Sequence, residues 1–304
     1  MTRVSDIGTY NQTLTNLRDT QNRIDTLTTQ AATGYVSTRY SGIAANSRQL
    51  VNLESSLSRM TQYKTNNQTV QLRLQTMEQS TTKLVEVATN LKTLLTNALN
   101  NNNAKDMALQ DTTGNMLAEA SRQLNAKLGD RYLFAGNSID APPVDLAAYA
   151  TPANSYPSAA DTSYYQGDAT RLNTQAAEDY TVAYGATADE PAFEKLMRSL
   201  KLANTTTLDP LDRDRLNDAL DLVNQAIQSI PDITSRIASA QTALDKVTTD
   251  NDDLKVYITQ SVVDITSIDV TEVMTRLTQD QTLLQASYMT ISSLSKLNLA
   301  SYLR

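Results

Sequence analysis

Several residue types that proteins use for chemistry are absent or scarce in this sequence. The 304-residue chain has no His, no Cys and no Trp, and only two Phe. It therefore lacks the commonest acid–base side chain, the commonest metal ligand and any possible disulfide. We expect a protein that is not an enzyme and that holds no metal and no cofactor.

The charge and the lack of long apolar runs exclude two further kinds of partner. The formal net charge is -7, so the basic surface that a nucleic-acid-binding protein needs is missing. No apolar run reaches about 18 residues, and polar residues continue from the N-terminus through Gln30. We predict no nucleic-acid binding, no membrane insertion and no cleaved signal peptide. Such a protein stays in the cytosol or leaves the cell by a route that cleaves no signal.

Glycine and proline are rare, and their spacing predicts long helices. Neither occurs between Gly42 and Gly114, nor from Asp232 to Arg304. A helix over residues 44–100 would be roughly 85 Å long at 1.5 Å per residue. The first helix is expected to end near Gly34, because glycine readily takes the left-handed conformation that ends helices.

Apolar residues recur every seven positions in both terminal segments, which is typical of coiled coils. One helix cannot bury such a seam alone, so we expect the two ends to pair with each other and with neighbouring copies. A lone pair would bury too little to offset its ordering cost, so both ends are expected to fold on assembly. The predicted assembly interface comprises Ile7, Tyr10, Leu14, Leu17, Ile24, Val270, Leu277, Leu284, Ile291, Leu294, Leu297 and Leu299.

The middle of the chain has a different character. Between Gly136 and Pro191 lie five of the seven prolines and six of the fourteen tyrosines. Short strands and turns are predicted at 164–168 and 179–185. Helices are expected to resume near Pro191 and at Asp209-Pro210, and Pro231 is expected to interrupt the second one.

The predicted fold is mainly α, a long coiled-coil-like helical rod formed by the N- and C-terminal segments, with a small β-rich inserted domain. The expected parts are an N-terminal assembly helix (1–35), the first half of the rod (36–135), the insert (136–190), the second half of the rod (191–260) and a C-terminal assembly helix (261–304).

Three clusters could carry chemistry, but each has a simpler structural explanation. Asp250–Asp253 lacks the central Gly and the later Glu of a calcium loop, so we interpret it as a solvated acidic patch on a helix. The carboxylates Asp189 and Glu190 stand beside Pro191 and suit a helix start better than glycoside hydrolysis. Tyr132 and Phe134 are expected to pack the insert against the rod.

Four segments resemble the flagellin superfamily and, within it, the family of hook–filament junction proteins, the third hook-associated proteins. The most specific are RYLFAG (131–136) and SSLSKLNLASYL (292–303). The chain departs from the family after the glycine break, where an acidic pair is usual and Arg39-Tyr40-Ser41-Gly42 stands here. The matching segments are Asn16–Tyr63, Gly129–Val144, Tyr164–Ala186 and Ile268–Arg304.

This resemblance implies a structural subunit of the bacterial flagellum, extracellular and forming the junction between hook and filament. It implies export in an unfolded state through the flagellar type III apparatus, with an export chaperone. The implied partners are copies of the chain in a helical ring, the hook-side junction protein and flagellin. A filament flagellin is the alternative within this class, and a coiled-coil sensor domain is the alternative outside it.

Overall fold

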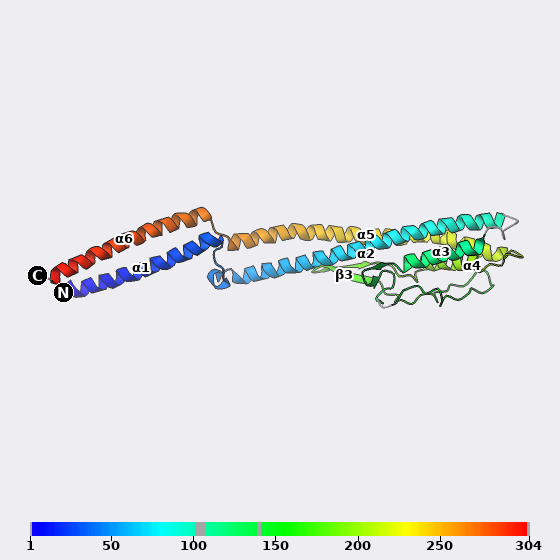
Figure 1. Cartoon of the computed structure of the whole chain (residues 1–304), viewed down its shortest axis with the longest axis horizontal. Helices are drawn as coiled ribbons and strands as arrows, with labels where there is room; N and C mark the ends of the chain where they lie inside the picture. The colour runs from blue at the N-terminus through cyan, green and yellow to red at the C-terminus, as the bar shows by residue number, and fades with distance from the viewer. Residues whose placement is uncertain (1, 101–107, 139–140, 303–304) are drawn as a thin grey trace. The chain divides into compact units, whose positions relative to one another are not determined.

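The two ends of the chain form one unit of the structure, and the middle forms another (Figure 1). The computed structural model describes residues 2–100, 108–138 and 141–302, with side chains from residue 8 to residue 293 within these ranges. We call residues 1–58 and 254–304 the terminal unit and residues 59–253 the central unit.

Helices dominate both units, and the strands are few and short, which confirms a mainly α fold with a small β insert. Two 54-residue helices, α2 and α5, contribute residues to both units. The helices are α1 (Thr2–Thr33), α2 (Ser47–Asn100), α3 (Leu109–Leu124), α4 (Pro191–Asn204), α5 (Arg213–Thr266) and α6 (Val270–Tyr302). A 3-10 turn, η1, covers Tyr40–Ile43, and the strands are β1 (Lys127–Leu128), β2 (Arg131–Tyr132), β3 (Leu172–Ala177) and β4 (Tyr180–Tyr184).

In the central unit, α2 and α5 run antiparallel and share a continuous apolar core. Two polar contacts fix their register: Asn67 donates to Thr248 at 3.3 Å, and Thr234 donates to Thr81 at 3.1 Å. Between these contacts, every apolar seam residue of α2 is buried, because the seven-residue spacing keeps them on one face. One seven-residue row of α2 is buried along its length: Val70, Met77, Leu84, Leu91 and Ala98.

Helices α3 and α4 pack against each other beside this core. Phe134, from the RYLFAG segment, is buried and meets Phe193 of α4 edge to face, with ring centroids 5.7 Å apart. This geometry places the positive edge of one ring against the negative face of the other. Phe134 is therefore a packing residue, and Tyr132 lies under the ammonium of Lys127 at 4.1 Å.

The insert contains one antiparallel hairpin, β3–β4, with a bulge between Gln175 and Ala177. The Ala176 carbonyl accepts hydrogen bonds from Asn67 of α2 at 3.0 Å and Asn251 of α5 at 3.4 Å, which attaches the hairpin to both helices. The predicted strand at 179–185 is correct and corresponds to β4.

At 164–168, where a short strand and a turn are predicted, the structure has the turn but no strand. This segment is a turn with a single bridge between Tyr165 and Val144, and the partner of β4 is Leu172–Ala177. The Tyr164 ring is fully buried against Tyr149, and its hydroxyl donates to the Ala188 carbonyl at 2.9 Å. Burial of this aromatic side chain decides the local backbone, which residue-by-residue β propensity cannot foresee.

The predicted helix start at Asp209-Pro210 is also wrong. These residues form a turn that brings Leu208 and Leu211 together in an isolated bridge. Helix α5 begins three residues later, where the Asp212 carboxylate accepts the backbone N–H of Arg215 at 3.0 Å and so caps the helix. Pro191, in contrast, begins α4 as predicted.

Pro231 does not interrupt α5, contrary to expectation. It lies inside the helix on its exposed face, while Ile230 and Ile233 beside it are buried in the core. A proline removes one backbone hydrogen bond and crowds the preceding turn. Burial of apolar side chains on both sides of it holds the helix together despite that cost.

Two leucines of α2 provide a matched test of this core. Leu74 is 0% exposed and Leu72 is 51% exposed. We expect Leu74→Ala to lower the free energy of unfolding of the central unit by about 2–5 kcal/mol, because it leaves a cavity. Leu72→Ala should change it by less than about 0.5 kcal/mol. Urea unfolding of the full chain followed by circular dichroism checks this, and equal losses for the two variants would contradict the assigned core face.

Candidate assembly interface

Helices α1 and α6 lie side by side in the terminal unit and share a narrow apolar seam (Figure 1). Among the described side chains of this pair, Leu17, Val273 and Leu277 are the buried apolar ones. One pair of amphipathic helices can bury only the stripe on which they touch. The remaining surface of both helices is open to other contacts.

The structure places the predicted interface residues in three environments. Leu17 and Leu277 are buried in the seam, while Tyr10 and Val270 are exposed. Leu14, Ile24, Leu284 and Ile291 are half-buried. The side chains of Ile7, Leu294, Leu297 and Leu299 lie outside the described residues.

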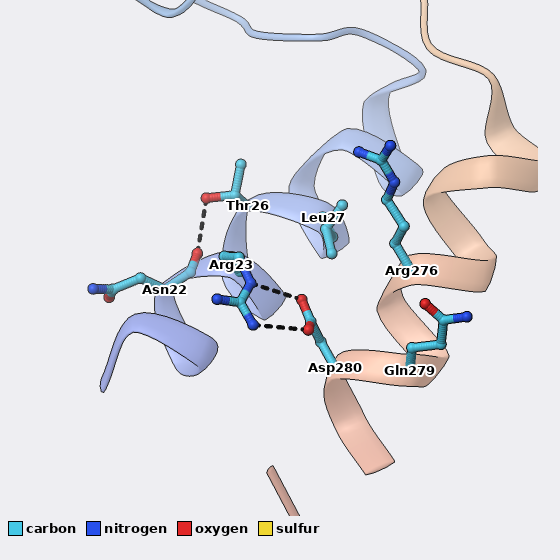
Figure 2. A pocket seen from close by; sticks show the side chains of 7 residues that line it. All are labelled: Asn22, Arg23, Thr26, Leu27, Arg276, Gln279 and Asp280. Atoms are coloured by element: carbon cyan, nitrogen blue, oxygen red, sulfur yellow. Dashed lines mark hydrogen bonds and ion pairs between the residues drawn. The ribbon is translucent and has the colours of Figure 1, made fainter. Parts of the chain in front are cut away.

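Polar contacts that the sequence analysis did not identify fix the register of α1 against α6. The Arg23 guanidinium donates two hydrogen bonds to the Asp280 carboxylate, at 3.0 and 2.9 Å (Figure 2). Gln21 donates to the Tyr288 hydroxyl at 2.7 Å. The hydrogen bonds from Arg23 lower the pKa of Asp280, and the bonded Asp280 raises the pKa of Arg23. A salt bridge between two residues 257 positions apart cannot be predicted from one sequence.

The turns that follow α1 and precede α6 are joined by backbone hydrogen bonds. Gly34 ends α1 with φ at 77°, as predicted, and its carbonyl accepts from the Ile268 N–H at 3.1 Å. The Val36 N–H donates to the Thr266 carbonyl at 2.8 Å. Neither glycine nor proline marks the break between α5 and α6; Asp269 makes it by accepting the N–H groups of Thr271 and Glu272.

Residues 35–54 and the end of α5 enclose an apolar groove, which we call the connector groove. Tyr40 donates to Glu54 at 2.8 Å, and this hydrogen bond raises the pKa of the tyrosine. Gly42 lies so close to Ser37 that a larger residue would displace the loop. The connector groove is lined by Tyr35, Ser37, Thr38, Arg39, Tyr40, Ile43, Leu50, Glu54, Val262, Val263, Thr266 and Ser267.

Exposed large apolar side chains concentrate in the terminal unit. Among the described residues, all but Leu72 and Tyr180 belong to it. A concentration of exposed apolar side chains in one unit is typical of contact sites, because leaving apolar surface in water is unfavourable. The exposed set is Tyr10, Tyr35, Tyr40, Val51, Leu254, Val256, Tyr257, Val263, Val270, Met274, Leu283, Tyr288 and Met289.

The clusters that could carry chemistry have structural roles here. Asp250–Asp253 lies within α5, and Asp252 binds Lys64 of α2 at 2.7 Å. The Glu190 carboxylate binds Arg236 at 2.6 Å. Within the described ranges, no group of three or more Asp and Glu is placed to hold a metal ion. None of the described helices combines the length and apolarity needed to cross a membrane.

The Arg23–Asp280 pair gives the α1–α6 contact a defined pH dependence. Because pairing lowers the pKa of Asp280, its contribution is complete above the ordinary pKa of about 3.9 and is lost as pH falls through the lowered value. We expect the α1–α6 contact to weaken as pH falls below about 4, and Asp280→Asn to weaken it already at neutral pH and to reduce this acid step.

Energy transfer between dyes attached to Thr15→Cys and Gln285→Cys measures the distance between α1 and α6. The labelled protein is assembled with an excess of unlabelled chains. The native chain has no cysteine, so the dyes attach only at these two positions. Asp25→Asn, an exposed carboxylate elsewhere on α1, is the matched control. An unchanged acid step in Asp280→Asn would contradict the assignment.

Two family models match the chain, and both describe flagellin. The bacterial flagellin N-terminal helical region matches residues 4–139, and the C-terminal helical region matches residues 220–303. Together they cover more than two-thirds of the sequence, including α1 from residue 4 onward, all of α2 and all of α6. No curated protein matches the sequence significantly.

Several solved structures share the fold. FlgL of Bacillus cereus is 16% identical, with a TM-score of 0.55, over 71% of this chain and 99% of that one. A putative flagellar hook-associated protein of Vibrio parahaemolyticus is 14% identical, with a TM-score of 0.58, over 72% and 97%. Flagellar hook-associated protein 3 of Legionella pneumophila is 12% identical, with a TM-score of 0.57, over 71% and 98%.

At these identities the solved structures establish the fold alone, and the family models establish the family. The seams of α1 and α6, which the two models match at either end of the sequence, meet in one helix pair. The chain therefore belongs to the flagellin superfamily and is a structural component of the bacterial flagellum.

Proposed function

We propose that this chain forms the junction between the hook and the filament of the flagellum, and that it assembles through its terminal unit. The observation that carries the proposal is the distribution of exposed apolar side chains, nearly all of which belong to the terminal unit. The central unit has a closed core of its own and needs no neighbour to bury it.

In this proposal, copies of the chain form a helical ring in which the open sides of α1 and α6 contact neighbouring copies. The hook-side junction protein and flagellin bind on either side of the ring. The chain reaches this place unfolded, through the flagellar type III export apparatus and with the help of an export chaperone. A thin terminal seam suits this route, because a weakly stabilised helix pair unfolds and refolds at small cost.

The alternative is a filament flagellin, which would share the terminal helices and the mode of assembly. Two observations favour the junction. The RYLFAG segment and the last dozen residues resemble junction proteins, and solved structures of this fold include FlgL and hook-associated protein 3. Phe134 of that segment joins the insert to α4 through Phe193, so the segment also has a clear structural role.

A deletion strain distinguishes the two functions. If the chain forms the junction, its loss leaves the hook without a site on which flagellin can polymerise, and unpolymerised flagellin accumulates in the medium. Immunoblots of culture supernatant and of sheared filaments measure this. Finding this chain as the bulk of purified filaments would assign it to the filament instead.

The half-buried residues of α6 test whether the seam drives assembly. We expect Leu284→Lys or Ile291→Asp to abolish assembly, because each places a charge at a half-buried seam position that a neighbouring copy would cover. Unfolding of the central unit should be unchanged. Gln285→Lys adds the same charge at an exposed position of α6 and is the control. Motility and electron microscopy of complemented deletion strains give the result, and normal filaments with Leu284→Lys would refute the role of the seam.

A further inference from the structure

The last three turns of α5 present two different faces in the terminal unit. Val262, Val263 and Thr266 line the connector groove, while Ile258 is buried. At 3.6 residues per turn, Leu254, Tyr257 and Asp264 fall on the side of the helix turned away from that groove. All three are exposed, and Tyr257 is 71% exposed. We call these three residues the α5 ridge.

The ridge is an apolar projection with an acidic margin. Leu254 and Tyr257 supply the apolar surface, and the Asp264 carboxylate stands two turns further along, where Gln260 donates to it at 2.8 Å. An exposed tyrosine ring covers a large area at little entropic cost and is a common anchor of protein contacts.

The connector groove has the complementary chemistry. Tyr35 and Tyr40 form an aromatic rim, Val263 is a partly open wall, and the Leu50 side chain lies buried behind them. Arg39 is the cation at this rim, and its backbone N–H is held by the Ser37 hydroxyl in a tight turn. The one carboxylate of the groove, Glu54, is occupied by the Tyr40 hydroxyl. An acidic, aromatic occupant therefore suits the groove.

We propose that the α5 ridge of one copy docks in the connector groove of the next copy, with Asp264 facing Arg39 and Tyr257 between the two rim tyrosines. This proposal rests on the proposed assembly of the chain, and it specifies the two surfaces through which neighbouring copies make contact. A chain cannot fill its own groove in this way, because ridge and groove lie on different sides of the same helix. Such a contact joins unlike surfaces head to tail, so it builds open or ring-shaped arrays rather than closed two-fold dimers.

Cysteine cross-linking tests the pairing in flagella purified from a complemented deletion strain. Residues 257 and 263 are six positions apart on one helix, about 9 Å along its axis, so the two cannot form a disulfide within a chain. We expect Tyr257→Cys/Val263→Cys to give a ladder of dimers, trimers and larger species on oxidation. Each single variant, and the control pair Tyr257→Cys/Leu72→Cys, should give none.

A charge exchange supplies the second measurement. Arg39→Asp and Asp264→Arg should each reduce cross-linking about tenfold, and the two combined should restore it, as expected for a close pair of opposite charges. Absence of the ladder in flagella that assemble normally, or no recovery in the double exchange, would overturn this contact while leaving the junction role intact. Failure of the wild-type chain to complement the deletion would instead overturn the proposed function, and the contact with it.

Discussion

The narrowness of the apolar seam between α1 and α6 is the constraint on which the rest of this account depends. Two helices in contact bury one stripe each, and here that stripe includes few fully buried side chains, such as Leu17, Val273 and Leu277. In the central unit, α3, α4 and the insert also pack against α2 and α5, and the apolar seam residues of these two helices are buried. Among the described residues, the terminal unit has no such cover of its own, which is why we propose that neighbouring copies bury its apolar surface.

Polar contacts then decide how that thin seam is aligned. Apolar stripes slide past each other with small changes in burial, whereas the two hydrogen bonds between Arg23 and Asp280 exist in one register only. The backbone hydrogen bonds around Gly34 and Thr266 hold the helix ends beside each other in the same register. In the central unit, Asn67 and Thr81 have this role on a mainly apolar face of α2.

Much of the fold could be predicted from the sequence, because its main signal is periodic. The seven-residue rows and the scarcity of glycine and proline were enough to place α1, α2 and most of α5 and α6. The failures occurred where tertiary burial overrides local preference. Pro231 lies inside α5, which is stabilised by the buried apolar residues beside it. Tyr164 is buried in the core and is not part of a strand.

The candidate site was less predictable, and the reason is distance along the chain. Spacing within one helix predicted a set of seam residues, and of these Leu17 and Leu277 are buried in the structure. The connector groove combines residues 35–54 with residues 262–267, and no pattern in either segment indicates the other. Asp269 lies between α5 and α6, and no glycine or proline beside it indicates in the sequence that the helix ends there.

Hydrogen exchange of the amide groups tests the central claim most directly, measured on the purified monomer and on the same chain in assembled flagella. We expect α2 and α5 of the central unit to be protected in both states, and α1 and α6 to gain protection only on assembly. If α1 and α6 were as strongly protected in the monomer as in the flagellum, the seam would be sufficient by itself. Neighbouring copies would then not be needed to stabilise the terminal unit.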